Sequence, residues 1–211
     1  MKTTSKKPAI DKNKPLKPYQ KLGVFFLIVV LSGLVGWVWE FIIQEFEGGF
    51  RHIYIKGGNF LPWLNIYAYG AVAVIAITYK IRKHPWLVFI VSALVTGTIE
   101  FIGGWFAYTF YNGARYWDYT NKWWGIGNID GFVCPVSVTI FGLGSLFFVY
   151  VLLPFCANLA VKIKKRTFLT LATVLFLAVI TDDLTNLTLK NLDLPTAINF
   201  YESLGFKLLH K

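Results

Sequence analysis

Charged residues are scarce in this chain. They make up 15% of its 211 residues, whereas hydrophobic residues make up 55%, and the mean hydropathy is +0.53. Soluble domains usually contain about 25% charged residues. A chain with so few cannot cover a core with polar surface, so we expect the lipid bilayer to be its solvent. The formal net charge of +10 does not indicate a nucleic-acid partner, because the basic residues form short clusters between apolar runs, as in membrane loops.

The sequence also lacks the common motifs that supply energy or bind metals. It has no phosphate-binding loop of the form Gly-x-x-x-x-Gly-Lys-Ser/Thr, so it cannot power transport by itself. It has no Cys-x-x-Cys, His-Glu-x-x-His or Gly-x-Ser-x-Gly segment. The three histidines form no evident cluster, and Cys134 and Cys156 would lie about 33 Å apart if one helix held both, too far for a disulfide. We therefore expect no metal site and no cofactor.

Five apolar runs dominate the remaining sequence. They cover residues 22–43, 62–79, 85–110, 132–161 and 167–189. A hydrocarbon core about 30 Å thick needs about 20 apolar residues in a helix, so these runs predict an all-α, polytopic transmembrane bundle over residues 22–190. A basic tail precedes it at 1–21, and an amphipathic tail follows at 191–211, where it could lie on the membrane surface.

Lysine and arginine are concentrated in alternate segments between these runs. The N-terminal tail is Lys-rich, and further basic clusters occur at 80–83 and 162–166. By the positive-inside rule these three segments face the cytoplasm, and the less basic loops at about 44–61 and 111–131 face outside. We expect a multi-pass protein of the plasma membrane, with its C-terminus outside if the fifth helix crosses completely.

The first and third apolar runs resemble each other. One contains Gly36-Trp-Val-Trp-Glu40-Phe-Ile, and the other contains Gly97-Thr-Ile-Glu100-Phe-Ile. Each glutamate is followed by an aromatic-rich loop and then, after 25 or 28 residues, by an Asn-Ile step at Asn65 or Asn128 that opens the next helix. This pattern indicates a parallel repeat of a two-helix unit, an arrangement that transporters use with the substrate site where the copies meet.

Glu40 and Glu100 are the strongest candidates for a functional site. A carboxylate within a transmembrane helix is expensive and normally faces the bundle interior or a water-filled cavity. Small residues one turn earlier allow close helix packing on the same side. Both glutamates fall in the outer half of the bundle, where they could bind a cation, a proton or a polar substrate. The alternative is a structural role, in which each carboxylate only pairs with a neighbouring side chain.

Further candidates lie near the expected outer surface. The third loop contains Trp117, Asp118 and Tyr119, which could form a lid over the site or simply a packed interfacial loop. Asp182 and Asn186 share a helix face four residues apart and could add to the acidic site or mark a plain helix end. Three residues at the starts of the second and fourth helices complete the set of substrate- or ion-binding candidates: Asn65, Tyr67 and Asn128.

Several of these motifs occur together in one known family. The segments Gly36-Trp-Val-Trp-Glu40, Ile66-Tyr-Ala-Tyr-Gly70, Glu100-Phe-Ile-Gly-Gly104, Trp117-Asp-Tyr119 and Asn128-Ile-Asp-Gly131 with Cys134-Pro135 resemble those of the bacterial ABC-transporter permeases of the CmpB, or type IV, kind. The second helix departs from the family's Pro-Ile-Tyr-Gly step, since it has Asn at 65 and Gly only at 70. The resemblance implies a membrane permease that works with a separate ATPase subunit.

Three functions are compatible with these patterns. The first is a permease-like transport subunit for a small solute or ion, with the acidic site in its path, and it is the one we favour. The second is a membrane-embedded enzyme acting on a lipid-linked or cell-envelope substrate, with a glutamate as general acid or base. The third is a non-catalytic accessory or sensor subunit. Besides the bilayer, the expected partners are an ATPase subunit or further copies of the chain.

Overall fold

A computed structural model describes residues 15–48, 54–55, 59–110, 113, 115, 117–205 and 207–208. Most of the basic tail expected at 1–21, much of the 44–61 loop, and the end of the amphipathic tail at 209–211 therefore lie outside the described residues.

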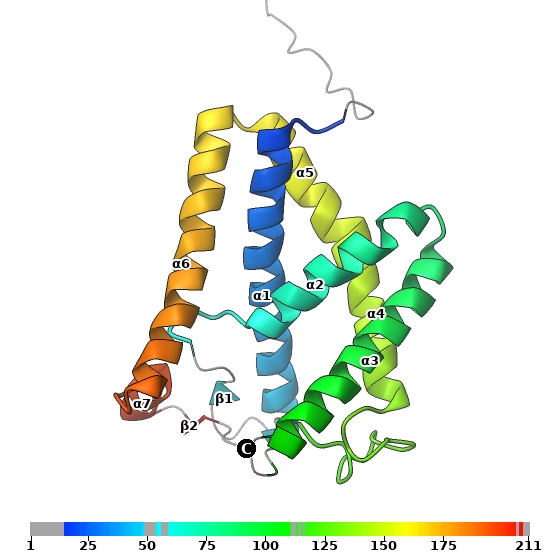
Figure 1. Ribbon diagram of the computed structural model, residues 1–211, viewed down its shortest axis with the longest axis vertical. Coiled ribbons are helices and arrows are strands. Elements are labelled where there is room, and N and C mark those ends of the chain that lie inside the picture. The colour runs from blue at the N-terminus through cyan, green and yellow to red at the C-terminus, as the bar shows by residue number, and fades with distance from the viewer. Residues whose placement is uncertain are drawn as a thin grey trace, which may run out of the picture.

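The protein is an all-α helical bundle, as the apolar runs predicted (Figure 1). The long helices are α1 (Pro18–Gly48), α2 (Asn65–Thr78), α3 (Pro85–Phe110), α4 (Pro135–Phe147), α5 (Leu153–Lys162) and α6 (Lys165–Asn191). Shorter elements are η1 (Tyr79–Ile81), η2 (Phe148–Leu152), α7 (Ala197–Ser203) and the two-residue strands β1 (Tyr54–Ile55) and β2 (Lys207–Leu208), which pair in parallel.

Four segments of the described chain are long and apolar enough to cross a membrane: Pro18–Ile43, Pro85–Phe110, Pro135–Lys162 and Lys165–Asn191. The apolar helix Asn65–Ile81 is shorter; its 17 residues span only about 25 Å. The segment Pro135–Lys162 is helical throughout because η2, a π-helical turn, joins α4 to α5 just before Pro154. A proline removes one backbone donor and crowds the preceding turn, and a wider turn relieves that clash.

Helix α1 lies at the centre of the bundle, between α2 and α6 and against α5 (Figure 1). One core cluster joins Val24 and Ile28 of α1 to Cys156 of α5 and to Phe168 and Ala172 of α6. A second cluster, which begins at the next α1 residue, Val29, contains Trp63, which is 2% exposed and donates from its indole N–H to the Val29 carbonyl at 3.1 Å. Because α1 is enclosed, it is the most buried of the four spanning segments.

The helix ends separate into two groups (Figure 1). The start of α1, the α5–α6 turn and the α2–α3 turn lie toward one end of the molecule, and these carry the Lys and Arg clusters. The other end holds the 117–134 loop, α7 and the paired strands. We refer to these as the basic end and the loop end; by the positive-inside rule we expect the basic end to face the cytoplasm.

Candidate functional site

Glu100 of α3 is buried near the loop end, with 8% of its surface exposed. One carboxylate oxygen accepts a hydrogen bond from the Tyr119 hydroxyl at 2.6 Å, and the other accepts one from the Ser137 hydroxyl at 2.8 Å. Within the described residues, no lysine or arginine forms an ion pair with Glu100. The carboxylate is therefore stabilised by neutral hydroxyl donors, without a cation from these residues.

Different local structures hold Ser137 and Tyr119, the two hydrogen-bond donors to Glu100, in place. Ser137 is the third residue of α4 and completes a capping box with Cys134, whose sulfur accepts from the Ser137 backbone N–H while Ser137 Oγ accepts from the Cys134 N–H at 3.1 Å. Tyr119 comes from the preceding loop, and its backbone N–H donates to the Gly131 carbonyl at 3.0 Å. Burial, followed by the nearby Glu100 charge, raises the pKa of the Tyr119 hydroxyl well above its ordinary value. Tyr119 therefore stays a hydrogen-bond donor at any physiological pH.

Glu40 of α1 forms the second part of the candidate site. Its carboxylate accepts from the Tyr67 hydroxyl of α2 at 2.7 Å. Tyr67 lies directly on Gly36, where any Cβ would come within 2.1 Å of the tyrosine ring. The same ring also approaches Phe141 of α4, with a centroid separation of 6.4 Å. A single tyrosine thus joins three helices at the level of Glu40.

These two parts meet on α4. Phe141, which the Tyr67 ring approaches, lies four residues after Ser137, which donates to Glu100, so the two residues share one face of that helix. Carboxylates from α1 and α3, each with a tyrosine hydroxyl, therefore lie on either side of the start of α4. We call Glu40, Tyr67, Glu100, Tyr119 and Ser137 the carboxylate group.

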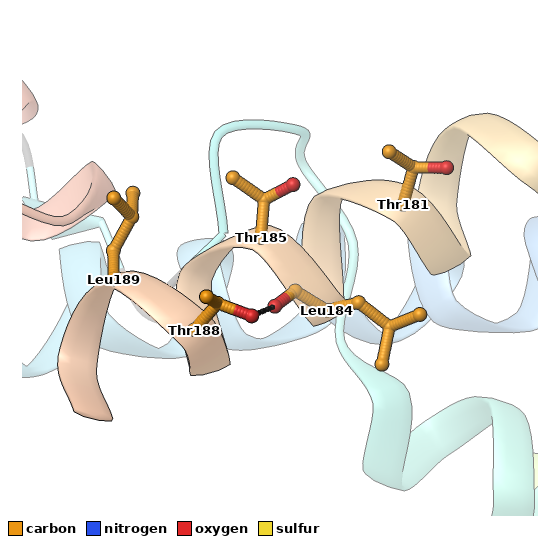
Figure 2. A pocket seen from close by; sticks show the side chains of 5 residues that line it. All are labelled: Thr181, Leu184, Thr185, Thr188 and Leu189. Atoms are coloured by element: carbon orange, nitrogen blue, oxygen red, sulfur yellow. Dashed lines mark hydrogen bonds between the residues drawn. The ribbon is translucent and has the colours of Figure 1, made fainter. Parts of the chain in front are cut away.

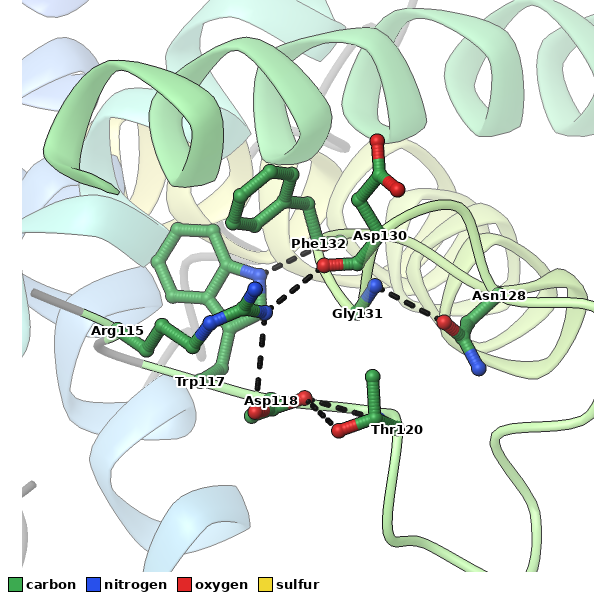
Figure 3. A network of polar contacts seen from close by, with 8 residues as sticks. All are labelled: Arg115, Trp117, Asp118, Thr120, Asn128, Asp130, Gly131 and Phe132. Carbon is green, nitrogen blue, oxygen red and sulfur yellow. Dashed lines mark hydrogen bonds and ion pairs between the residues drawn. The ribbon is translucent and has the colours of Figure 1, made fainter. Parts of the chain in front are cut away.

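Trp117, Asp118 and Asn128 all lie in the third loop and form hydrogen bonds within it (Figure 3). The prediction that Asn128 opens the fourth helix is wrong, because α4 begins only at Pro135, whose ring favours the first helical position. The Trp117 indole donates to the Phe132 carbonyl at 2.7 Å. Asp118 accepts from the backbone and hydroxyl of Thr120 and lies 3.7 Å from the Arg115 guanidinium. Asn128 donates to the Gly125 carbonyl and accepts from the Gly131 N–H. These residues shape the loop that carries Tyr119.

Gly131 is the backbone position on which this loop depends. It has φ +74°, and a Cβ there would come within 2.5 Å of the Asp118 carboxylate and 2.7 Å of the Arg115 guanidinium. Only glycine fits both the left-handed conformation and the close approach. Because the Gly131 carbonyl accepts the Tyr119 N–H, the loop around Gly131 positions Tyr119 over Glu100.

Asp182 and Asn65 belong to a separate polar cluster on α6. Asp182 accepts from the backbone N–H groups of Phe60 and Leu61 at 3.0 and 2.7 Å. Asn65 donates to Asp183 at 3.2 Å, and the Asn186 amide oxygen accepts from the Ala197 N–H at 2.9 Å. The Tyr201 hydroxyl donates to the Phe60 carbonyl. This α6 cluster attaches the segment before α2 and the C-terminal helix α7 to the bundle.

We predict that Asp182→Asn destabilises the protein by about 1 kcal/mol, because an amide offers one acceptor oxygen where the carboxylate now serves two backbone donors. Thermal unfolding in detergent measures this change. The matched control is Asp193→Asn, an exposed acid-to-amide change at φ +52°, a conformation that asparagine tolerates. An equal effect of both variants would contradict a bridging role for Asp182.

A shallow hollow of about 290 Å³ lies beside the same part of α6 (Figure 2). Its walls are Thr181, Leu184, Thr185, Thr188 and Leu189, which repeat along one face of the helix. The Thr188 hydroxyl donates to the Leu184 carbonyl within the helix at 2.8 Å. None of the candidate residues lines this hollow, so it is distinct from the carboxylate group.

Sequence reasoning missed Ser137. It had a recognisable signal, since Cys134-Pro135 followed two residues later by serine has the form of a capped helix start. Asp183 was visible beside Asp182 in the far half of the last apolar run, but its partners had no signal, because they are 118 and 124 residues away. Within the described residues, no three His, Cys, Asp or Glu side chains come together as metal ligands would.

Residues 24–187 match the model of the family described as "Putative ABC-transporter type IV". The chain belongs to this family. The match covers the whole of the carboxylate group and most of the bundle, and it agrees with the resemblance inferred from the motifs. No curated protein and no solved structure matches the chain. Family membership and the apolar helices together identify a multi-pass membrane protein and a component of the ABC-transporter kind.

Proposed function

We propose that this protein is the permease-like subunit of a transporter for a small cation or cationic solute, and that the carboxylate group is its binding site in the outer half of the bundle. The observation that carries the proposal is Glu100, a buried carboxylate in a spanning helix. It accepts hydrogen bonds from two hydroxyl groups. The substrate would supply the missing positive charge.

The energetics favour a site over a purely structural contact. Burying a carboxylate costs several kcal/mol even after relaxation, and hydrogen bonds from two hydroxyls offset only part of this cost. Glu40, a second carboxylate of the same group, raises the cost further, since like charges repel. A structural role would be served as well by neutral residues. A buried Glu100 that accepts from two hydroxyl groups, with a second acid in the same group, is the arrangement that a cation or a proton would stabilise.

Two features indicate the side from which the substrate would enter this site. The carboxylate group lies toward the loop end, opposite the basic end of the bundle. The third loop covers it with Tyr119, which is itself buried. We propose that substrate enters from the outer side past this loop, and that a separate ATPase subunit binds at the basic end, because this chain has no phosphate-binding loop of its own.

The test is a thermal-shift screen of the purified protein. The probes are Na⁺, K⁺, Mg²⁺, Ca²⁺ and small organic amines, each at two pH values. A ligand at 100 times its Kd stabilises a protein by about 2.7 kcal/mol, or roughly 5–10 °C for a chain of this size. We expect such a shift for at least one probe, and its loss in the double variant Glu40→Gln/Glu100→Gln.

The control for this screen is Asp130→Asn. Asp130 is an exposed loop acid at φ +51°, so the change removes one negative charge without touching the carboxylate group. If the control and the double variant respond alike to every probe, the site proposal is wrong. In that case the glutamates only hold the bundle together, and an accessory role becomes the better description. Chemical turnover of a lipid-linked probe would instead favour the enzyme.

A further inference from the structure

Ser92 of α3 has a hydroxyl group without a partner. Its side chain is 0% exposed, and its oxygen makes no hydrogen bond within the described part of the chain. Other buried helical hydroxyls here donate to the carbonyl one turn earlier, as Ser32, Thr78 and Ser145 do. Ser92 could make the same bond and does not. A buried hydroxyl left unpaired costs about 1–3 kcal/mol. We therefore expect the Ser92 hydroxyl to form a hydrogen bond with a group outside its own helix.

The position of Ser92 connects it to the carboxylate group. Ser92, Thr96 and Glu100 follow one another at intervals of four residues and so share one face of α3. This face runs from Glu100 about 12 Å toward the basic end. The Thr96 hydroxyl donates to the Ser92 carbonyl at 2.7 Å, so the Thr96 oxygen can still accept a hydrogen bond. A row of hydroxyls therefore leads inward from the buried carboxylate.

Ser145 of α4 lies at about the same depth as Ser92. Gly142 of α4 faces Phe89 and Ala93 of α3, since a Cβ on Gly142 would come within 2.8 and 3.2 Å of their side chains. Ser145 is one turn further inward on α4. The Ser145 hydroxyl also donates to a backbone carbonyl, so its oxygen can accept a hydrogen bond. Ser92 can thus donate to a shared partner that in turn donates to Thr96 or Ser145.

The row of hydroxyls ends at an apolar barrier. Val88 of α3 packs with Val74 of α2 and Val149 of η2, and all three are at most 4% exposed. Val88 is one turn inward of Ser92, and Val149 is one turn inward of Ser145. The valines therefore separate the hydroxyl row from the basic end.

We propose that Ser92 binds a buried water molecule together with Thr96 and Ser145, that this water extends the carboxylate site inward, and that the valine cluster closes the path from the cytoplasm. Buried waters typically make about three hydrogen bonds to such groups. The direction of the path rests on the proposed function, whereas the water site itself does not depend on it.

The first test is the sign of the stability change in Ser92→Ala. If the Ser92 oxygen binds water, removing it leaves that water with fewer partners, and the Tm falls. If the oxygen is dry and unpaired, alanine removes an unsatisfied group, and the Tm rises, which would overturn the water site. The matched control is Ser32→Ala, equally buried but with its hydroxyl bonded to the Ile28 carbonyl.

The second test asks whether the valine cluster closes the path. It measures the passive proton leak with a pH-sensitive dye inside proteoliposomes. We expect Val88→Ala to increase the leak over wild type. Val179→Ala makes the same change in the core between α1 and α6 and should not. Equal leaks in both variants would overturn the closure. Neither test needs a transported substrate, so a failed cation screen with a lowered Ser92→Ala Tm would reject the proposed function and keep the water site.

Discussion

Replacing Glu100 by glutamine is expected to weaken cation binding by about 10–100-fold while the protein remains folded. Glutamine has nearly the same shape, and its amide oxygen can still accept one of the two hydrogen bonds that the Tyr119 and Ser137 hydroxyls donate. What it loses is the negative charge. Charge-assisted hydrogen bonds are worth about 1.5–3 kcal/mol, and each 1.4 kcal/mol changes Kd about tenfold. A titration of the cation that stabilises the wild-type protein measures this directly.

Two companion variants separate the charge from the packing. Glu100→Ala should lower the stability by about 1–3 kcal/mol, because it leaves the buried Tyr119 hydroxyl without its acceptor, whereas Ser137 can still donate to the Cys134 carbonyl. Tyr119→Phe removes one donor and keeps the charge, so it should weaken binding far less than Glu100→Gln does. If Glu100→Gln binds the cation as tightly as wild type, Glu100 is a structural residue and the proposed site is wrong.

The bundle itself could be predicted from hydropathy because the cost of exposing backbone polar groups to lipid leaves helices as the natural spanning element for apolar runs of this length. The exact ends depend on local chemistry. Proline begins α1, α3 and α4 at Pro18, Pro85 and Pro135, where its missing N–H costs nothing. The π turn before Pro154 has no pattern in hydropathy, since it is a response of the backbone to one residue inside an apolar run.

The glutamates could be found from sequence because a carboxylate in an apolar run is conspicuous. Their partners could not. Tyr119 lies 19 residues from Glu100 along the chain and Ser137 lies 37 residues away, and both contacts depend on how the loop folds. The same folding gives Trp117 and Asn128 short-range partners within their own loop, so their polarity is used to build the loop. Polar residues in such a loop do not reveal which of them point toward a site.

The internal likeness of the two halves has a structural counterpart with a difference. In each half a glutamate in the second half of the first helix accepts from a tyrosine hydroxyl. Tyr67 lies two residues after Asn65 in α2, whereas Tyr119 lies nine residues before Asn128 in a loop. The Glu–Tyr pairing therefore recurs without the same register, and Asn65 binds Asp183 while Asn128 binds its own loop.

Gly33→Ala is expected to destabilise the protein by about 2–4 kcal/mol. A Cβ on Gly33 would come within 2.0 Å of the Trp63 indole nitrogen and 2.3 Å of the neighbouring ring carbon. The ring cannot simply move aside, because Trp63 is 2% exposed and its N–H donates to the Val29 carbonyl. Overpacking a core costs about 1–3 kcal/mol, and a displaced indole would also lose a hydrogen bond of about 0.5–1.5 kcal/mol.

Gly70→Ala provides the matched control in α2. No atom lies within 4 Å of the place where its Cβ would be, so the change meets no clash and gains about 0.5–1 kcal/mol of helix propensity. The two variants should therefore move the Tm in opposite directions. Adding Trp63→Phe to Gly33→Ala should recover part of the loss, because the smaller ring makes room for the methyl group. Were Gly33→Ala as stable as Gly70→Ala, the contact between α1 and Trp63 would be looser than described, and α1 would not be fixed there by the chain that leads into α2. Since α1 and α2 carry Glu40 and Tyr67, that result would also remove the reason to expect a rigid geometry at the carboxylate group.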